Sequence, residues 1–167
     1  MLAGKGKITR GQVDEYRARL HGTLDLADFA DCDLVIEAVI ENMEEKLRLF
    51  PALDHIVKPG ALLLTNTSSL NVTQMGAVTK RPDKVCGLHF FNPAPVMKLV
   101  EVVRTISTSE ETIEIVKQFA ISLGKTPVIR PFGDPVQRRA IAQAAVALTR
   151  PRCNDRRPTR IVPGGPS

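Results

Sequence analysis

The sequence lacks several features that would assign a protein to a class at once. No run approaches the roughly 18 consecutive apolar residues that a membrane-spanning helix needs. The opening segment, MLAGKGKITRGQVDEY, contains no apolar core of the kind that a secretion signal carries. The cysteines are odd in number and unrelated in spacing, which argues against a disulfide framework and a zinc site (Cys32, Cys86 and Cys153). These absences predict a cytoplasmic protein without a metal centre, and its 167 residues fit one domain with a buried core.

Positive charge is scarce in the body of the chain, although the net charge is +5. Residues 1–129 carry 15 lysines and arginines against 16 acidic residues, whereas residues 130–167 carry eight arginines against two aspartates. This basic tail also holds half of the twelve prolines and a single aromatic residue, Phe132. Arginines neutralise phosphates, but one ring offers little base stacking, so nucleic-acid binding is the least favoured hypothesis below.

Apolar periodicity predicts strands that alternate with helices. The run DLVIEAVI is typical of a strand buried on both faces of a parallel sheet, and four further strands are predicted at GALLLT, VCGLHFF, KLVEVVRTI and TPVI. The segment ENMEEKLRLFPALDHI predicts an amphipathic helix that Pro51 kinks or breaks. A second helix is predicted over 108–123, where Thr108 and Glu111 have capping-box spacing and Gly124 closes the end. An N-terminal helical face is formed by Ile8, Val13, Tyr16 and Leu20.

These elements predict the α/β class, with a doubly wound and mostly parallel sheet. We expect one domain over residues 1–129. Residues 130–167 form an Arg-, Pro- and Ala-rich tail, in which Gln137 to Leu148 predict a helix and the last 18 residues predict disorder.

Polar residues follow the predicted strands at the points where a parallel sheet binds its ligands, outside the carboxyl ends. They are Glu41 and Lys46 after the first strand, Asn66, Thr67, Ser68 and Ser69 after the second, and Asn92 after the third. One crevice can gather them all. Each also has a structural interpretation, because Glu41 and Lys46 fit a solvated helix start, whereas Ser68 and Ser69 fit a turn or a helix cap.

The stretch GLHFFNPAPVMKLVEVV places two titratable groups in neighbouring apolar segments. His89 and Glu101 are twelve residues apart, so one strand can end, a loop can turn, and the returning strand can bring the two side chains together. The chemical interpretation is an imidazole that moves a proton and a carboxylate that orients it. The structural interpretation is a satisfied core histidine and a buried acid paired with a lysine. Glu37, inside its own strand, needs a backbone or lysine partner, and Cys86 is typical of inert core.

Four segments, DCDLVIEAVIENMEEK, TNTSSL, GLHFFNPAPVMKLVEVV and SLGKTPV, closely resemble the NAD-binding domain of L-3-hydroxyacyl-CoA dehydrogenases, including 3-hydroxybutyryl-CoA dehydrogenases. The resemblance covers about residues 5–129 and keeps the family's motif order and spacing. It implies a partial Rossmann-like sheet and NAD as the cofactor. The implied reaction is oxidation of L-3-hydroxyacyl-CoA, such as 3-hydroxybutyryl-CoA, to 3-ketoacyl-CoA in fatty-acid β-oxidation or butanoate metabolism.

The resemblance also implies roles for individual residues. His89 would be the catalytic base, and Glu101 the carboxylate that fixes its tautomer and stabilises the imidazolium. Ser68 would hydrogen-bond the reacting oxygen beside the cofactor, and so act in catalysis, substrate binding and cofactor binding. Further cofactor contacts are implied for Ala38 (through its backbone), Glu41, Lys46 and Asn92.

The sequence departs from the family at both ends. Family members begin with a strand, a G-x-G-x-x-G turn and a helix N-terminus that holds the pyrophosphate, whereas GKGK at residues 4–7 has neither the strand nor the spacing. We therefore expect a domain truncated at its N-terminus, with an exposed apolar strand edge and weakened NAD affinity. After KTPV the chain reads IRPFGDPVQRRAIAQ in place of the family's proline-glycine-phenylalanine turn, asparagine-arginine pair and helical dimerisation domain. This abrupt change suggests an altered reading frame or a misplaced gene boundary.

Three hypotheses remain open at this point. The first is an NAD-dependent dehydrogenase with an acyl-CoA substrate. The second is a catalytically dead fragment or a partner-binding remnant, without the glycine-rich loop and the dimerisation domain. The third is a binder of nucleic acid or acidic surfaces that uses the arginine-rich tail, and no membrane partner is expected. An active chain reduces NAD without a partner, which separates the first hypothesis from the second. Salt-dependent retention on DNA would support the third.

Overall fold

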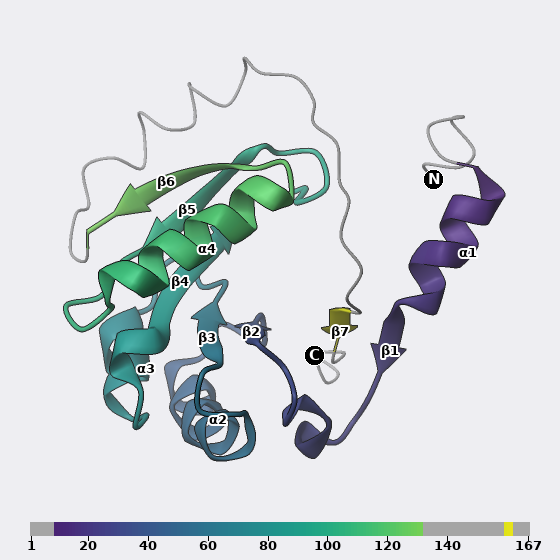
Figure 1. The fold of residues 1–167 in the computed structure, drawn as a ribbon. Coiled ribbons are helices and arrows are strands. Elements are labelled where there is room, and N and C mark those ends of the chain that lie inside the picture. The colour runs from purple at the N-terminus through teal and green to yellow at the C-terminus, as the bar shows by residue number, and fades with distance from the viewer. Residues whose placement is uncertain (1–8, 132–158, 162–167) are drawn as a thin grey trace.

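A five-stranded sheet organises the described part of the chain, which is residues 9–131 and 159–161 of this computed structural model. Neighbouring strands follow the order β2 (Leu34–Glu37), β3 (Leu62–Thr65), β4 (Val85–Phe90), β5 (Leu99–Val103) and β6 (Thr126–Arg130). Strands β2, β3 and β4 are parallel, β5 runs antiparallel to β4, and β6 is parallel to β5. The predicted α/β class with a mostly parallel, Rossmann-like sheet is confirmed (Figure 1).

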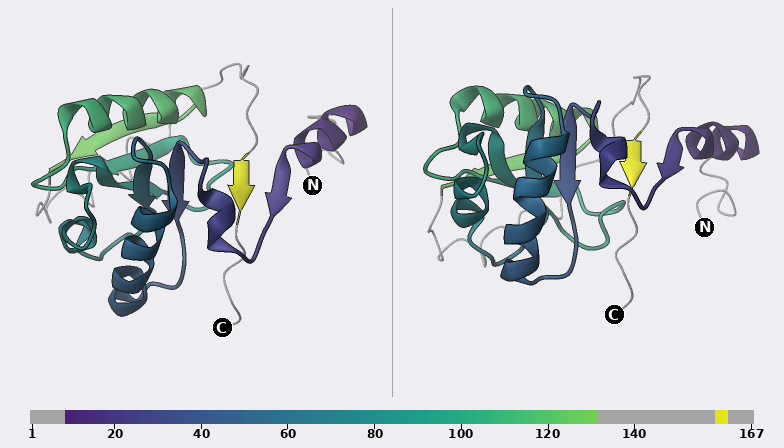
Figure 2. Two further views of the ribbon diagram at one scale, coloured as in Figure 1. Left: turned by 60° about the horizontal axis from the view of Figure 1, so that its bottom comes forward. Right: turned by 90° about the horizontal axis from the view of Figure 1, so that it is seen from below.

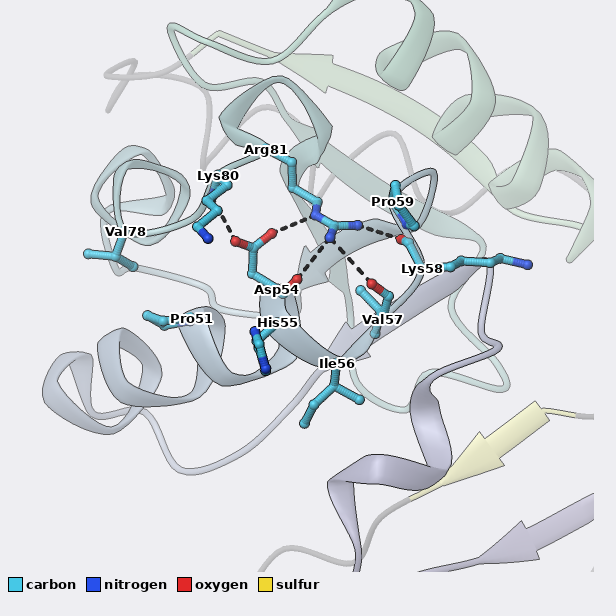
Figure 3. Close-up of a pocket in the computed structure, with 10 residues that line it drawn as sticks. All are labelled: Pro51, Asp54, His55, Ile56, Val57, Lys58, Pro59, Val78, Lys80 and Arg81. Carbon is cyan, nitrogen blue, oxygen red and sulfur yellow. Dashed lines mark hydrogen bonds and ion pairs between the residues drawn. The ribbon is translucent and has the colours of Figure 1, made fainter.

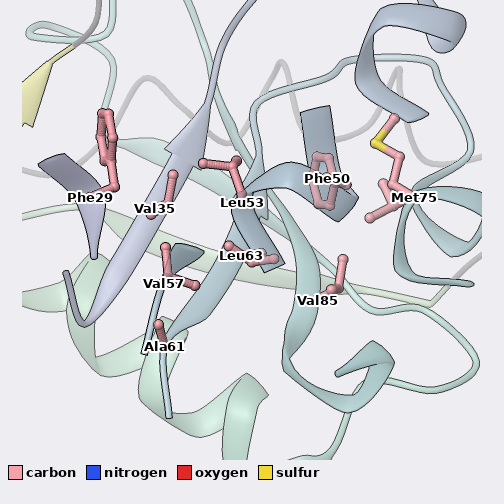
Figure 4. Packing of buried hydrophobic residues seen from close by; sticks show 10 residues of the cluster. Phe29, Val35, Phe50, Leu53, Val57, Ala61, Leu63, Met75 and Val85 are labelled. Carbon is pink, nitrogen blue, oxygen red and sulfur yellow. The ribbon is translucent and has the colours of Figure 1, made fainter. Parts of the chain in front are cut away.

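Helices cover both faces of this sheet. Helices α2 (Met43–Ile56) and α3 (Val72–Ala77) lie on one side, and α4 (Glu110–Ser122) lies on the other (Figure 2). Under α2 and α3 the core contains Phe29, Val35, Phe50, Leu53, Val57, Ala61, Leu63, Val72, Met75 and Val85 (Figure 4). Under α4 it contains Leu62, Leu64, Cys86, Leu88, Val100, Val102, Ile113, Val116 and Ala120. Alternate residues of β3 and β4 face opposite helices, which explains why their sequences are nearly all apolar.

The thiol of Cys86 belongs to the core beneath α4, as the sequence predicts. Burial raises its pKa to about 12, so the thiol stays protonated at neutral pH. A protonated and inaccessible thiol is a poor nucleophile and a poor metal ligand. Among the described residues, no group of three or more His, Cys, Asp or Glu side chains is placed to hold a metal ion.

The N-terminal segment lies beside the layered core (Figures 1 and 2). Helix α1 (Arg10–Ala18) begins at a capping box formed by Thr9 and Gln12, and it buries none of its residues. A short strand, β1 (Leu20–Gly22), pairs in parallel with β7 (Thr159–Ile161). The predicted helical face is therefore wrong at Leu20, which lies in β1, while Ile8 lies outside the described residues. The single-turn 3-10 helices η2 (Leu26–Phe29) and η3 (Pro82–Lys84) complete the elements.

Two local predictions about helix ends are corrected by the structure. Pro51 does not break α2, which runs through it from Met43 to Ile56. The cap of α4 is Ser109, whose side chain accepts the Thr112 N–H, and not Thr108. The predicted end at Gly124 is confirmed, because its φ of 71° lies in the left-handed region that glycine adopts readily.

Two predictions for the tail reach beyond the described residues. The helix expected over Gln137 to Leu148 lies wholly outside them. Within the last 18 residues, for which disorder was expected, 159–161 form β7 and the others lie outside the described part. None of the described helices has the length and apolar character that crossing a membrane requires.

Candidate functional site

The carboxyl ends of β2, β3 and β4 meet at one edge of the sheet, because these three strands are parallel and adjacent. Ala38 follows β2, residues 66–69 follow β3, and Asn92 follows β4 within two residues. Ala38, Ser68 and Asn92 are all exposed. These segments therefore lie at one edge of the sheet and leave exposed residues there, whereas the single crevice that would gather all of the predicted polar residues stays a prediction.

His89 and Glu101 meet on β4 and β5, where they are directly opposite in the antiparallel ladder. The His89 Nδ1 lies 2.8 Å from the Glu101 Oε2, and the Glu101 side chain is only 6% exposed. An ionised carboxylate only accepts hydrogen bonds, so it selects the tautomer in which Nδ1 carries the proton. The other ring nitrogen, Nε2, then keeps its lone pair. This is the arrangement of a base held in place by an acid.

Two further side chains bound this pair. The Phe91 ring lies 4.9 Å from the His89 ring, centroid to centroid, at an interplanar angle of 51°. The Asn66 Oδ1 accepts the Phe90 N–H at 2.9 Å, which ties the end of β3 to β4 beside the histidine. The imidazole therefore has a fixed place at the edge of the sheet.

Arg130, at the end of β6, is a member of the site that the sequence did not predict. Its Nη1 donates to the Glu101 Oε1 at 2.8 Å, so one carboxylate joins an imidazole on β4 and a guanidinium on β6. The structural interpretation of Glu101 as an acid paired with a lysine is therefore wrong. A signal existed in the sequence, since an arginine closes the apolar run TPVI, but the run carries no indication of which acid it meets.

Lys46 is buried, at 1% exposure, beneath the polar edge of the sheet. Its Nζ donates to the Glu37 Oε1 at 2.6 Å and lies 3.6 Å from the Glu41 Oε2. Glu37 also accepts the Val39 N–H at 2.6 Å and the Thr65 hydroxyl at 2.7 Å. The predicted lysine or backbone partner of Glu37 is confirmed in both forms. Lys46 as part of a solvated helix start is wrong.

Glu41 organises the loop after β3. Its Oε1 accepts hydrogen bonds from the Thr67 hydroxyl, from the Ser68 N–H at 3.3 Å and from the Ser69 hydroxyl at 3.2 Å. Partial burial raises the pKa of this carboxyl, but the hydroxyl donors and the Lys46 ammonium outweigh it and hold the pKa below 4.5. The serines do not cap a helix, because Asn71 caps α3. Glu41 thus sets the position of the backbone that presents Ser68.

Lys125 binds the loop between β4 and β5, the strands that carry His89 and Glu101. The Lys125 Nζ donates to the Ala94 carbonyl and to the Met97 carbonyl, the latter at 2.7 Å. The loop begins with a cis peptide bond between Asn92 and Pro93. Burial lowers the pKa of Lys125. No role was predicted for this lysine, although it lies in the SLGKTPV segment.

A hollow lies at the other end of the sheet, near the C-terminus of α2 (Figure 3). Arg81 fills its centre. The guanidinium donates to the Asp54 Oδ1 at 2.6 Å, to the Asp54 carbonyl at 2.8 Å and to the Lys58 carbonyl at 2.6 Å. Because these donors are engaged with the protein itself, the hollow is a capped helix end and offers a ligand few free groups.

Comparison with known proteins places the chain in a family. The profile described as "3-hydroxyacyl-CoA dehydrogenase, NAD binding domain" matches residues 1–131. The chain is 49% identical over 127 residues to a probable 3-hydroxybutyryl-CoA dehydrogenase of Deinococcus radiodurans, covering 76% of this chain and 45% of that protein. It is 48% identical over 140 residues to a probable 3-hydroxybutyryl-CoA dehydrogenase of Bacillus subtilis, covering 83% of this chain and 49% of that protein.

A solved structure agrees with these matches. The crystal structure of (S)-3-hydroxybutyryl-CoA dehydrogenase PaaH1 from Ralstonia eutropha superposes with a TM-score of 0.79 at 37% identity, covering 85% of this chain and 51% of that one. The chain thus spans about half the length of the relatives it matches. By sequence and by fold, it belongs to the NAD-binding domain family of the 3-hydroxyacyl-CoA dehydrogenases, whose cofactor is NAD.

Proposed function

We propose that this chain contributes the proton-transfer site for NAD-dependent oxidation of an L-3-hydroxyacyl-CoA, with 3-hydroxybutyryl-CoA as the first substrate to test. The observation that carries the proposal is the 2.8 Å contact between His89 Nδ1 and the buried Glu101 at an edge that presents exposed Ser68 and Asn92. A neutral imidazole is suited to this work, because its ordinary pKa of about 6.5 lies near neutral pH. The reaction belongs to fatty-acid or butanoate metabolism.

The groups at this edge fit one half of the cofactor. Ala38, Ser68 and Asn92 are exposed around the ends of the three parallel strands, and Glu41 is 41% exposed beside them. We assign the nicotinamide and its ribose to these residues, since amide, hydroxyl and carboxylate groups match the hydrogen-bonding needs of that half. Lys46 acts from beneath, because its ammonium is buried between Glu37 and Glu41.

In the proposed mechanism, the His89 Nε2 takes the proton of the substrate's 3-hydroxyl as C3 becomes a carbonyl carbon. NAD, held by the residues assigned above, would supply the electron sink for the hydride of C3. The Ser68 hydroxyl donates to the reacting oxygen and holds it near Nε2. Glu101 stabilises the imidazolium that forms, as the acid does in hydrolase triads. Phe91 limits rotation of the ring from the side.

The test is turnover of NAD and L-3-hydroxybutyryl-CoA by the chain and by two histidine variants. His89→Gln should lower the rate by about 10²- to 10⁴-fold, because general base catalysis contributes that much. His55→Gln is the matched control, since His55 is exposed near the C-terminus of α2, away from the site. Equal rates for the wild type and His89→Gln would sink the proposal.

A second candidate function is the partner-binding hypothesis of the sequence analysis, which stays a proposal. In this alternative the chain is a catalytically dead fragment or a remnant that acts by associating with an intact relative. Mixing the chain with the Bacillus subtilis relative separates the two functions. A chain that turns over alone supports the enzyme. A chain that is silent alone and changes the relative's rate or assembly supports the remnant.

A further inference from the structure

Glu101 is a buried acid with two partners of different kinds. One carboxylate oxygen accepts from the His89 Nδ1 and the other accepts from the Arg130 Nη1, each at 2.8 Å. The side chains of His89, Glu101 and Arg130 are 17%, 6% and 11% exposed. The three groups belong to three adjacent strands, β4, β5 and β6. The Glu101 carboxylate on β5 therefore lies between the imidazole on β4 and the guanidinium on β6.

The strand register explains how the arginine reaches the acid. Glu101 is opposite His89 on one side and opposite Val128 on the other, and Arg130 is two residues beyond Val128. Residues two apart on a strand point to the same face, so Arg130 projects on the same face as Val128 and Glu101. The Arg130 carbonyl also accepts the Arg104 N–H at 2.9 Å, which fixes the end of β6 against β5.

We propose that Arg130 is a positioning residue that keeps Glu101 anionic while His89 is neutral, and thereby leaves the proton of the ring on Nδ1. This proposal rests on the role of His89 as the base. A buried carboxylate needs a charged partner or it gains a proton. A neutral imidazole does not supply that charge, whereas a guanidinium is always charged. Arg130 thus allows an ionised acid and an uncharged base to be neighbours.

Loss of the guanidinium would change which ring nitrogen carries the proton. A protonated Glu101 would donate to Nδ1, and the ring proton would then move to Nε2, which removes the lone pair that faces the substrate. Alternatively the ring itself would take up the proton and pair with the acid as an imidazolium. Both outcomes leave Nε2 protonated. The tautomer of His89 is therefore the direct measure of what Arg130 does.

Other charged groups near this edge have partners of their own. On β2 and α2, Glu37 and Lys46 bind each other, and Glu41 is bound by the loop after β3. Lys125, below the loop that follows β4, donates to two carbonyls. Within the described part of the chain, the charged group that binds the His89–Glu101 pair is thus the Arg130 guanidinium of β6.

The experiment reads the ring nitrogens of His89 by NMR in the free 15N-labelled chain, at a pH about two units above the ordinary imidazole value. The His89→Gln spectrum identifies the signals among the three histidines. In the wild type we expect the proton on Nδ1. In Arg130→Gln and Arg130→Met we expect at least half of the population to be protonated at Nε2. Arg130→Lys keeps the charge and should restore most of the Nδ1–H form.

Arg104→Met is the matched control, because Arg104 closes the neighbouring strand and pairs with the exposed Glu110. It should leave the tautomer unchanged. A wild-type tautomer in both neutral variants of Arg130 overturns the proposal. If both variants fail to fold, the same NMR measurement is made on Glu101→Gln, because its carboxamide cannot be anionic. A retained Nδ1–H form of His89 in that variant also overturns the proposal. The measurement needs no substrate or cofactor, so a failure of turnover remains a separate result.

Discussion

Two arginines bind buried carboxylates in this fold, and they do so in different ways at different ends of β4. Arg81, just before β4, donates to Asp54 and to backbone carbonyls at the end of α2. Arg130 reaches the level of His89, where it shares Glu101 with the imidazole. The first acid is bound by the Arg81 guanidinium and by the Lys80 N–H, so its contacts are with a permanent cation and with the backbone. The second acid is bound by the Arg130 guanidinium and by an imidazole, whose proton can lie on either ring nitrogen.

The difference shows how the same pair of residue types can bind the end of a helix in one place and, under the proposed function, orient a catalytic base in another. At Asp54 every bond satisfies the backbone or the arginine, and the Arg81 charge is favourably placed at a helix C-terminus. At Glu101 one carboxylate oxygen accepts from the Arg130 guanidinium and the other binds the His89 Nδ1. The second ring nitrogen of His89, Nε2, has no bond to this acid. A buried ion pair is weak evidence of function by itself, and the titratable neighbour supplies the distinction.

The largest stability effect should come from breaking the first pair. Arg81→Met removes the guanidinium donors and leaves the buried Asp54 with one backbone N–H. Breaking a buried pair by removing one partner costs about 3–5 kcal/mol, and we expect a loss of free energy of unfolding of that size. Urea unfolding followed by circular dichroism measures it, with Arg81→Lys as a milder version if the methionine variant does not fold.

Arg48→Met is the control for this experiment, because Arg48 is 67% exposed and pairs with Glu44 and Glu45 on the surface of α2. Exposed pairs are worth up to about 1 kcal/mol. If Arg81→Met costs no more than Arg48→Met, the stabilising role of the first pair is wrong. If it changes the tautomer of His89, the two ends of β4 are coupled and the contrast between them fails.

Much of this fold could be predicted from the sequence, because β3 and β4 bury alternate residues against helices on both sides and must be apolar throughout. The errors were made where a tertiary contact overrides a local pattern. Thr108 has the right spacing for a cap, but its hydroxyl donates to the Val85 carbonyl at 2.7 Å, and Ser109 takes the cap instead. Pro51 is exposed on α2, where the helix tolerates it without a break.

The site was predicted in part for a similar reason. The His89–Glu101 contact lies within twelve residues and one strand turn, so sequence spacing and family resemblance could indicate it. Arg130 is 29 residues from Glu101, beyond α4, and only the strand order brings it near. For Lys46 the structural interpretation was a solvated helix start, because a lysine in the first turns of a helix is usually solvated, and the resemblance implied a cofactor contact instead. The acid that binds the buried Lys46 is Glu37, which lies on β2 and not on α2.

A smaller effect is expected at Gly87, where β4 comes close to β5 two residues from the His89–Glu101 pair. A Cβ at this position would lie 2.8 Å from the Val103 Cβ, which is closer than real contacts allow. Gly87→Ala should therefore force the two strands apart and cost about 1–3 kcal/mol, as overpacked sites do. The same shift should loosen the His89–Glu101 contact and weaken the preference for the Nδ1–H tautomer.

Gly60→Ala is the control, because nothing lies within 4 Å of its Cβ position, and it should change stability by less than about 0.5 kcal/mol. The double variant Gly87→Ala with Val103→Gly removes the clashing atom, so the alanine should cost less in that background. Equal costs in both backgrounds would show that the strand spacing does not depend on Gly87. The tautomer would then be insensitive to it as well.

The smallest effect concerns Glu41, an acid held by hydroxyls rather than by an arginine. Burial raises its pKa, but the Thr67 hydroxyl and the Lys46 ammonium hold it below 4.5. Between the folded and unfolded pKa values the unfolded chain binds more protons, so stability rises with pH in that window. The contribution is complete above about 4.5 and is lost as the pH falls through the folded value. At 41% exposure, solvent screening limits it to less than about 1 kcal/mol.

Urea unfolding of the wild type and Glu41→Gln at several pH values between about 3 and 6 tests this sign. The wild type should be the more stable at the upper end, and its advantage should shrink as the pH falls. Thr67→Val removes one of the donors that lower the folded pKa, so in that background the advantage at the upper end should be smaller and its loss should be complete at a higher pH. An advantage that grows toward acid would mean that burial outweighs the donors. Glu41 would then be a strained acid, and its hold on the Ser68 backbone would cost stability at neutral pH.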